Sequence, residues 1–534
     1  MNIPILRNVY RYPVSVLIHP IPLLAFFSLL VPKPFRRMTT LLLGAYLLVW
    51  SGSPFLDICY GGEYALVPGS VHLHSTISNG EKTAEEIVAL ARESGIEAVI
   101  FTDHDTMRWT YGLSPLRRVI QKVINQNSIL KYGAENYIDT IEALDTKYPE
   151  TVVIHGTEAI PFYYWQGSVF KKTLTLLSGN KHILAVGLKT ASDYQNLPSV
   201  GNGFPASFNG ESFVSLWPLS LFALGWWFVS LQRKRSTRQE VSVNTVSLNR
   251  ILGIICFFIG AVFMVNNFPF RTPLYDQYHG DQGTGPYQHL IDYVNERDGL
   301  TFWAHPEVKR TAEIQGVRVD SSPYENDLLN THNYTGIAVF SEGMRHIGPP
   351  GGIWDKILLQ YCLGKRERPV WVLGEVDYKV GDFPIDETQT VFFVQEKSRE
   401  AILHAMKSGK MYAAMGAANA LTLTNFVVEE VQSGNSAFMG EEIQLTTKPR
   451  IRISVTVNHD HTLSEYRERG FTIDLIRNGT VIKTFEATDS VDIVYDDDYI
   501  HLNEKVYYRL AIDTSYLFRG IVSNPIFVTF KEKL

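Results

Sequence analysis

Residues 71–106 read VHLHSTISNGEKTAEEIVALARESGIEAVIFTDHDT and decide the fold, because they place two histidine-bearing segments on either side of one helix. His72 and His74 are two positions apart, so in a strand both imidazoles project from the same face, as two ligands of one metal must. After the helix, the β-branched run at residues 96–101 leads into Asp103 and His104. The stretch therefore predicts strand, helix and strand, with metal-ligand residue types on both strands.

The helix between the two strands has signals at both ends. Thr83 can cap its amino end, and Glu86 stands three residues later, which is the pattern of a capping box. Ile87 and Leu90 contribute to an apolar stripe, and Gly95 stands where a left-handed carboxyl cap is expected. These signals predict a helix between Thr83 and Gly95.

The composition limits the class of protein. The chain has 534 residues, which is enough for two or three domains. A net charge of -6 argues against a nucleic-acid binder, which usually has a basic face. Only 19% of residues are charged and 12% are aromatic, which favours a partly membrane-embedded chain. Three cysteines are too few for a disulfide framework or a thiolate zinc site; Cys59 and Cys362 either pair or are free thiols.

Four apolar segments predict a membrane protein. They form two pairs, residues 14–31 with 38–56 and residues 213–231 with 251–268. Each segment is close to the roughly 20 residues that cross the hydrocarbon core of a bilayer. Each pair encloses a loop and is typical of a transmembrane helical hairpin. The alternatives are a cleaved signal peptide for the first segment and buried core helices for the third and fourth.

The distribution of basic residues predicts the orientation. Both hairpin loops are rich in Lys and Arg, whereas residues 57–71 and 191–212 contain neither. The positive-inside bias therefore places both loops in the cytoplasm and the remainder of the chain outside it, although Arg7 and Arg11 oppose this orientation. We expect a multi-pass membrane protein whose candidate metal residues lie outside the cytoplasm.

Beyond residue 106 the chain alternates strand and helix signals as far as residue 416. Such repeated β-α units favour a parallel sheet or a closed barrel, with the chemistry at the strand ends. The predicted strands are residues 151–160, 181–188, 299–306, 336–340 and 369–377.

From about residue 421 the pattern changes. Apolar and polar residues alternate in segments joined by turn signals such as Asn478-Gly479. This pattern predicts an all-β domain, a small sandwich with a structural or partner-binding role. Its acidic run at residues 496–498 is more typical of a solvated turn than of a calcium site.

Between residues 69 and 416 the chain resembles the PHP (polymerase and histidinol phosphatase) superfamily of metal-dependent hydrolases. The matching elements are HLHS at 72–75, SNG at 78–80, TDHD at 102–105, GTE at 156–158, His182, AHP at 304–306 and GEVD at 374–377. HxH alone is a weak signal, but these elements together and in order are specific. The resemblance is greatest to membrane-attached or exported members, including a branch with carbamate-ester hydrolases.

The resemblance implies a distorted (β/α)7 barrel interrupted by the second hairpin. The domains predicted are an amino-terminal transmembrane hairpin at 1–57, a barrel in two parts at 69–212 and 269–416, an inserted transmembrane hairpin at 213–268 and a β sandwich at 421–534.

The resemblance also implies a dinuclear metal centre. Two cations of zinc, manganese or iron, about 3.5 to 4 Å apart, polarise a substrate oxygen and hold a hydroxide nucleophile near neutral pH. The implied ligands are His72, His74, Glu158 and Asp377 for one cation, and His182 and His305 together with the shared Glu158 for the other.

At a third cation position, to which His104 belongs in some members, the sequence departs from the family. Asn79 stands where the family has Asp, and Asp377 is followed at the second position by Lys379, where the family has His. We therefore expect a third cation to be weak or absent. His104 then acts as acid, base or substrate contact, and Asp103 orients it or caps the next helix.

Four further residues have two interpretations each. His155 is either a partner of Glu158 or a turn residue. Lys309, Arg310 and Arg345 either receive an anionic group or are solvated surface charges.

The sequence predicts a membrane-anchored hydrolase that acts on a small-molecule phosphoester. Hydrolysis of a carbamate or another carboxylic ester on the same centre is the alternative. A non-catalytic extracytoplasmic ligand-binding or adhesion protein is an alternative of another class. The letters leave the substrate, the metal and the oligomeric state open.

Overall fold

The computed structural model describes residues 64–236, 248–381, 384–416, 420–458, 470–513 and 520–532. The predicted hairpin at residues 1–57 and the thiol of Cys59 lie outside the described residues, while Cys256 and Cys362 are free.

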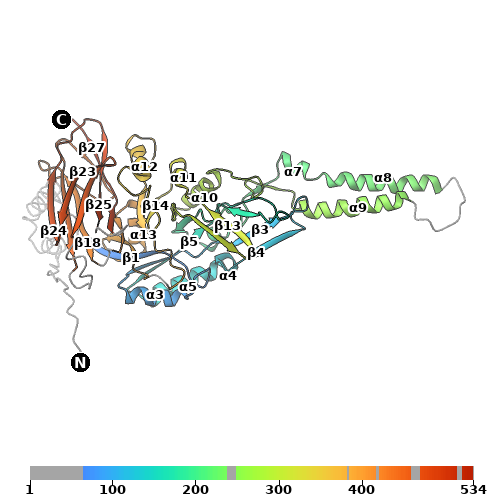
Figure 1. Ribbon diagram of the computed structural model, residues 1–534, viewed down its shortest axis with the longest axis horizontal. Helices are drawn as coiled ribbons and strands as arrows, with labels where there is room; N and C mark the ends of the chain where they lie inside the picture. The colour runs from blue at the N-terminus through green and yellow to red at the C-terminus, as the bar shows by residue number, and fades with distance from the viewer. Residues whose placement is uncertain are drawn as a thin grey trace, which may run out of the picture. The chain divides into compact units, whose positions relative to one another are not determined.

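One sheet forms the frame of the first part of the chain (Figure 1). Its strands, in spatial order, are β1 (Ala65–Leu73), β2 (Ala98–Phe101), β5 (Val152–Ala159), β8 (Ile183–Val186), β11 (Leu300–Trp303), β14 (Gly336–Phe340) and β15 (Trp371–Gly374). Beyond β15, the amide of Val376 donates to the carbonyl of Val71 and that of Tyr378 donates to the carbonyl of His72, each at 3.0 Å. These bonds bring the last strand of the series back to the first. The predicted α/β class is confirmed.

Helices cover this sheet. They are α3 (Ala84–Glu93), α4 (Ile129–Tyr132), α5 (Ala134–Lys147), α6 (Ala191–Gln195), α10 (Gly285–Asn295), α11 (Glu325–Asn330), α12 (Ile353–Cys362) and α13 (Arg399–Ser408). In α3 the predicted capping box is present, since Thr83 Oγ1 accepts from the amide of Glu86 and Glu86 Oε2 accepts from the amide of Thr83. Gly95 has the expected left-handed backbone, with a φ of 79°. Ile87 and Val88 on this helix are buried in the core.

Strand β8 departs from the repeated parallel pattern that the sequence predicts. It runs antiparallel to both of its neighbours, β5 and β11. A parallel neighbour needs a crossover of a dozen or more residues, usually a helix. The connection from β5 to β8 instead forms the short strands β6 (Tyr164–Gln166) and β7 (Thr175–Leu177), which join β12 (Arg310–Ile314) and β13 (Val317–Ser321) in a separate sheet. The beginning of β8 therefore lies at the same edge of the sheet as the ends of β5 and β11.

Two long apolar helices interrupt the chain between β8 and β11. After α7 (Gly210–Val214), α8 (Pro218–Ser236) and α9 (Leu248–Asn267) lie side by side (Figure 1). Their backbones approach closely, since a Cβ on Gly253 would lie 3.0 Å from the carbonyl oxygen of Gly225. Small residues permit such an approach between helices in membranes.

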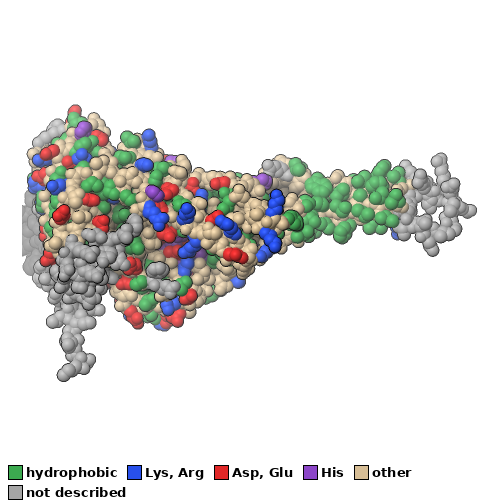
Figure 2. Space-filling model, viewed as in Figure 1, with side chains coloured by type: hydrophobic (Ala, Val, Ile, Leu, Met, Phe, Trp, Pro, Cys, Tyr) green, Lys and Arg blue, Asp and Glu red, His purple; other side chains and the backbone are tan. Residues whose placement is uncertain are grey.

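These helices are long and apolar enough to cross a membrane. The spans Ser212–Leu231 and Leu248–Asn267 have mean hydropathies of 1.5 and 2.2, and only 11% of each is buried. A core helix of similar composition is usually mostly buried, whereas most of both spans is exposed in this chain. Figure 2 shows the hairpin surface covered by hydrophobic side chains.

The carboxy-terminal part is β-rich, as predicted. Strands β19 (Ser436–Phe438), β18 (Leu421–Glu429), β21 (Arg450–Val457) and β24 (Val491–Asp496) form one sheet. The remaining strands are β20 (Glu442–Leu445), β22 (Phe471–Arg477), β23 (Thr480–Ala487), β25 (Lys505–Asp513), β26 (Gly520–Ser523) and β27 (Ile526–Phe530). The two layers share a core that includes Phe426, Ile453 and Leu510.

The second of these layers is continuous with the barrel sheet. β26 pairs with β17 (Met411–Met415), β17 pairs with β16 (Thr388–Val394), and β16 pairs with β1. Phe393 and Tyr412, from β16 and β17, belong to the core of the β-rich part. One sheet thus crosses the predicted boundary between residues 416 and 421.

Candidate metal centre

Two histidines at the end of β1 approach the same carboxylate. His72 sits where the pairing of β1 with β2 shifts register, and its φ is 73°. Such a bulge re-aims a side chain that the regular alternation of a strand would place elsewhere. His72 Nε2 lies 3.2 Å from Glu158 Oε1, and His74 Nε2 lies 3.1 Å from Glu158 Oε2.

Glu158 is fully buried at the centre of the cluster. It lies on β5, within the strand that the sequence predicts at residues 151–160. Its Oε1 also faces His305 Nε2 at 3.0 Å and His182 Nδ1, while its Oε2 faces His104 Nδ1 at 3.2 Å. The two oxygens of one carboxylate are therefore each surrounded by a different set of imidazoles.

Asp377 joins the side of the cluster formed by His72 and His74. Its Oδ1 lies 3.4 Å from His72 Nε2 and 3.5 Å from His74 Nε2. Two groups of ligand atoms result, in each of which all atoms lie within 4.8 Å of one another. The groups are His72, His74, Glu158 and Asp377, and Glu158, His182 and His305.

Three of these residues have a backbone conformation that L-residues rarely adopt. The φ angles of His72, His305 and Asp377 are 73°, 29° and 46°. Positive φ in a non-glycine residue costs free energy, and such residues often cluster at functional sites. His72 lies on β1, His305 follows β11 and Asp377 follows β15, and the three side chains converge on one place.

Several buried polar atoms of the cluster have no hydrogen-bond partner. Buried nitrogens and oxygens are nearly always paired, so a group of orphans at one place needs a ligand. Imidazole nitrogens and carboxylate oxygens suit zinc, manganese or iron, and the residues therefore fit divalent cations. The atoms are His72 Nε2, His74 Nε2, His104 Nδ1, His305 Nδ1 and Glu158 Oε2.

Charge interactions between these side chains shift their pKa values. Burial alone would raise the pKa of Glu158, but the imidazoles of His182, His72 and His104 outweigh it and lower that pKa well below its ordinary value. Burial also lowers the pKa of His104 well below 6.5, against the opposing effect of Glu158. An ionised Glu158 and a neutral His104 are the forms that bind a cation.

Glu375 positions two of the histidines and was not identified from the sequence. Its Oε2 lies 2.7 Å from His72 Nδ1, and its Oε1 accepts from the backbone amide of His305 at 2.5 Å. A carboxylate on the far nitrogen of a ligand histidine fixes the tautomer and the ring orientation. The signal was its place in GEVD, two residues before Asp377, but the letters do not show where its side chain points.

Asp103 lies beneath the loop that follows β1. It accepts from the amide of Ser75 at 2.8 Å, from Ser75 Oγ at 2.9 Å and from Ser78 Oγ at 2.5 Å. Ser78 Oγ in turn lies 3.3 Å from His74 Nδ1. These contacts are those of a residue that orders the loop, and a chemical role for Asp103 stays a prediction.

The residues of the predicted third position lie at one side of the cluster. Asn79 Nδ2 is 3.3 Å from His104 Nε2. Lys379 Nζ is 2.8 Å from Asp377 Oδ1, and the carboxylates of Asp377 and Glu158 outweigh burial and raise the pKa of Lys379. An ammonium group thus stands beside the two cation positions.

His155 lies outside the cluster. It is three residues before Glu158 on β5, and its Nδ1 is 2.7 Å from the hydroxyl of Tyr194. Burial lowers the pKa of His155 to about 4. It lies within β5 rather than in a turn, and its ring nitrogens face Tyr194 and Glu142 instead of Glu158. Lys309 and Arg345 line a small cavity with Glu307 and Glu342.

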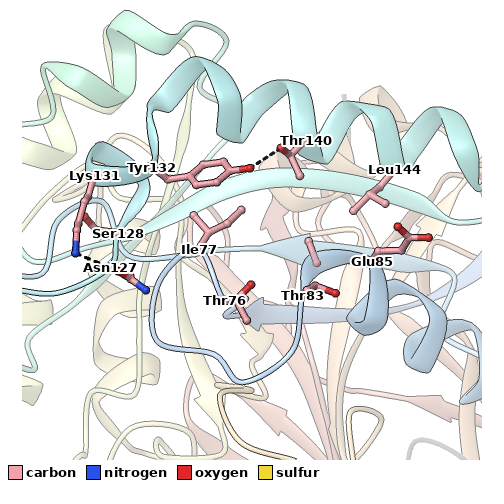
Figure 3. A pocket seen from close by; sticks show the side chains of 11 residues that line it. Thr76, Ile77, Thr83, Glu85, Asn127, Ser128, Lys131, Tyr132, Thr140 and Leu144 are labelled. Carbon is pink, nitrogen blue, oxygen red and sulfur yellow. Dashed lines mark hydrogen bonds between the residues drawn. The ribbon is translucent and has the colours of Figure 1, made fainter.

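A larger cavity of about 520 Å³ lies beside the loop after β1 and between α3, α4 and α5 (Figure 3). Its lining includes Thr76, Ile77 and Leu144, and Tyr132 bonds Thr140 across it at 3.3 Å. None of the cluster residues lines it, so it is separate from the candidate metal centre.

Comparisons with solved structures give distant likenesses. A two-domain protein from Bacteroides vulgatus, predicted to contain a PHP-like metal-dependent phosphoesterase, is 12% identical, with a TM-score of 0.32 over 85% of this chain and 92% of that one. A protein from Bifidobacterium adolescentis, proposed to be a metal-dependent phosphoesterase, is 14% identical, with a TM-score of 0.24 over 60% and 91%. An amidohydrolase from Chromobacterium violaceum with bound sulfate and no metal is 14% identical, with a TM-score of 0.25 over 59% and 88%. At these TM-scores the likenesses support no inference about function.

No curated protein matches the chain. The family described as the PHP domain matches residues 70–197. That segment contains His72, His74, His104, Glu158 and His182, and it is similar to the PHP domain.

Proposed function

We propose that the chain is a membrane-anchored, metal-dependent hydrolase of phosphoesters. The observation that carries this proposal is the place of Glu158, which belongs both to the group of His72, His74 and Asp377 and to the group of His182 and His305. One carboxylate shared by two groups of ligand atoms is what a pair of neighbouring cations requires. Two divalent cations, when bound, supply a hydroxide nucleophile near neutral pH and polarise the substrate oxygen.

Some residues of the chain would bind the cations, and others orient the residues that bind them. His72, His74 and Asp377 would hold one cation, and His182 and His305 the other, with Glu158 between them. Glu375 keeps His72 in the tautomer whose Nε2 is free to bind. His104, which is neutral and lies next to Glu158, is placed to accept a proton or to contact the substrate.

Lys379 favours a phosphoester over a carbamate or a carboxylic ester. Its ammonium lies beside Asp377, on the side of the cluster where Asn79 and His104 meet. Two divalent cations and this ammonium outweigh the charges of Glu158 and Asp377, so the centre is positive and suits an anionic group. An uncharged ester would gain little from Lys379. We propose that this ammonium replaces a third cation as the contact for a phosphate oxygen.

The membrane anchor of this proposal rests on α8 and α9. Their spans are apolar, and little of either is buried. Basic residues at the loop between them favour a cytoplasmic loop, which would place the metal centre on the other side of the membrane. Labelling of single cysteines introduced at the two ends of the hairpin, in intact cells, tests this orientation. Labelling of the loop from outside would reverse it.

The decisive experiment measures metal content and turnover on one preparation. The full chain is purified in detergent, its metals are determined by elemental analysis, and it is tested with phosphomonoesters, phosphodiesters and carbamate esters. We expect two divalent cations per chain and hydrolysis of a phosphoester, both lost in Glu158→Gln and both kept in His404→Ala, an exposed histidine of α13. Two bound cations without turnover of any ester would instead support a ligand-binding protein.

A further inference from the structure

Four arginines line a cavity at the base of the helical hairpin. The cavity has a volume of about 510 Å³ and lies between the β3–β4 hairpin, formed by β3 (Arg108–Gly112) and β4 (Gln121–Asn125), and the ends of α7 and α9. We propose that it binds the phosphate of an anionic phospholipid headgroup. The arginines are Arg108, Arg117, Arg118 and Arg271.

The charge of this cavity is not neutralised by the protein. In the part of the chain that the structure describes, none of the four arginines pairs with a carboxylate. Asp276 also lines the cavity. Its Oδ2 lies 2.6 Å from His279 Nδ1, and its Oδ1 accepts a hydrogen bond from the amide of Tyr278 at 2.7 Å. The site therefore has an excess of positive charge, and guanidinium groups bind phosphate oxygens with two parallel hydrogen bonds.

Two of the arginines are fixed in place and two are free to reach a ligand. The Arg117 guanidinium lies 4.1 Å from the centre of the Tyr278 ring, and Arg118 donates to the carbonyl of Phe268. Arg108 and Arg271 are exposed. This combination provides a rigid cationic wall and two side chains that can close on a phosphate.

The cavity is joined to the apolar hairpin by direct bonds. The amide of Arg118 donates to Asn266 Oδ1 at 3.0 Å, and Asn267 Nδ2 donates to the carbonyl of Ser215 at 2.7 Å. Asn266, Asn267 and Ser215 all line the cavity. The arginines therefore lie at the level where the hairpin leaves its apolar environment.

Exposed apolar side chains surround the same place. Phe213 and Phe268 are 67% and 66% exposed, and Ile120, directly before β4, is 51% exposed. Figure 2 shows Lys and Arg side chains gathered beside the apolar hairpin. Apolar groups that enter the acyl region, next to arginines at phosphate level, are the pattern of a membrane interface. A soluble phosphate compound would leave these apolar groups in water, which favours the lipid.

The inference rests on the proposed membrane anchor, but not on the proposed hydrolysis. The full chain is purified in detergent with equal amounts of phosphatidylglycerol and phosphatidylcholine, and the retained lipids are counted by native mass spectrometry. We expect preferential retention of phosphatidylglycerol, falling roughly fivefold for each arginine that is removed. The test variant is R108Q/R271Q, because neither side chain is part of the structural contacts described above.

Two matched variants complete the experiment. R108K/R271K keeps the charge and should keep most of the preference. K171Q/K407Q removes the same charge from exposed lysines elsewhere and should keep all of it. An excess of inorganic phosphate should not abolish retention, whereas its abolition would assign the site to a soluble phosphate.

Three outcomes would overturn the inference: equal retention of both lipids by the wild type, unchanged retention in R108Q/R271Q, or an equal loss in K171Q/K407Q. Extraction of membranes with alkaline carbonate tests the anchor separately. If the chain resists extraction and hydrolyses its substrate but shows no lipid preference, only the headgroup site fails.

Discussion

The carboxylate of Glu375 lies 2.7 Å from His72 Nδ1, and it leaves His72 Nε2 as the nitrogen that faces Glu158. The same carboxylate accepts the amide of His305, so one side chain orders a residue from each of the two groups of ligand atoms. The geometry of the cluster thus depends on Glu375, which belongs to neither group of candidate ligand atoms.

Replacement of Glu375 should therefore weaken metal binding. We expect Glu375→Gln to lower the affinity for divalent cations by about 10 to 100-fold, as is typical for the partner of a ligand histidine. Competition with a chromogenic chelator measures this. Glu313→Gln, at an exposed position of β12, is the control. Equal affinities for wild type and Glu375→Gln would show that the bond to His72 does not matter for metal binding.

Lys379 should affect the substrate more than the metal. We expect Lys379→Met to lower kcat/KM for a phosphomonoester by about tenfold or more, the value of one hydrogen bond to a charged group. Metal content should stay the same, and turnover of an uncharged ester should change little. Steady-state kinetics on both substrates, with Lys379→Arg as the charge-conserving control, measure this. A parallel loss on both substrates would count against a phosphate contact.

A buried ion pair joins the barrel to the β-rich part. Arg509 on β25 is fully buried, and its Nε and Nη2 each donate to Asp355 on α12 at 2.7 Å. Removal of one partner leaves an uncompensated buried charge, so Asp355→Ala should lower the free energy of unfolding by about 3 to 5 kcal/mol. Denaturant unfolding in detergent measures this. The double variant D355L/R509M should be more stable than D355A, whereas R318A, in an exposed pair, should change stability by under about 1 kcal/mol.

Glu430 gives the β-rich part a specific pH dependence. Burial would raise its pKa, but hydrogen bonds from Ser433, Thr446 and Thr447 outweigh burial and lower the pKa from 4.5 to about 2. A depressed pKa contributes stability above the unfolded value, and this contribution is lost as pH falls from about 4.5 towards 2.

The matching variant is Glu430→Gln. At pH 6 it should be less stable than the wild type by about 2 to 3 kcal/mol, and the difference should shrink towards pH 3. Unfolding curves at several pH values measure this, with Glu486→Gln, at an exposed position of β23, as the control. A difference that stays constant between pH 6 and pH 3 would contradict the assignment.

The α/β class and the helix α3 could be predicted because they depend on local signals. Thr83, Glu86 and Gly95 act within one helix, and their effect is read from neighbouring letters. The continuity of β17 with β26 could not be predicted, because it pairs segments more than a hundred residues apart, and alternation along each strand says nothing about its neighbour.

The identities of the candidate metal residues could be predicted from the sequence, but the backbone geometry that brings them together could not. The spacing of His72 and His74 suggested a regular strand, but a bulge with positive φ at His72 aims its ring at Glu158. His182 comes before its strand, and it reaches the cluster only because β8 runs antiparallel to its neighbours. The order of residue types in the sequence indicated these side chains. The bulge at His72 and the antiparallel direction of β8, which bring the side chains together, leave no local pattern in the sequence.

The position of α8 and α9 between β8 and β11 restricts how such a chain is assembled. Glu158 and His182 precede the hairpin, whereas His305 and Asp377 follow it, and each ligand group draws on both sides. β8 and β11 are hydrogen-bonded neighbours, so the two ends of the insertion lie close together, and with the proposed membrane anchor both ends would be on the same side of the bilayer. Such an anchor would cross the membrane an even number of times, and neither half of the chain, translated alone, contains all the residues of either candidate ligand group.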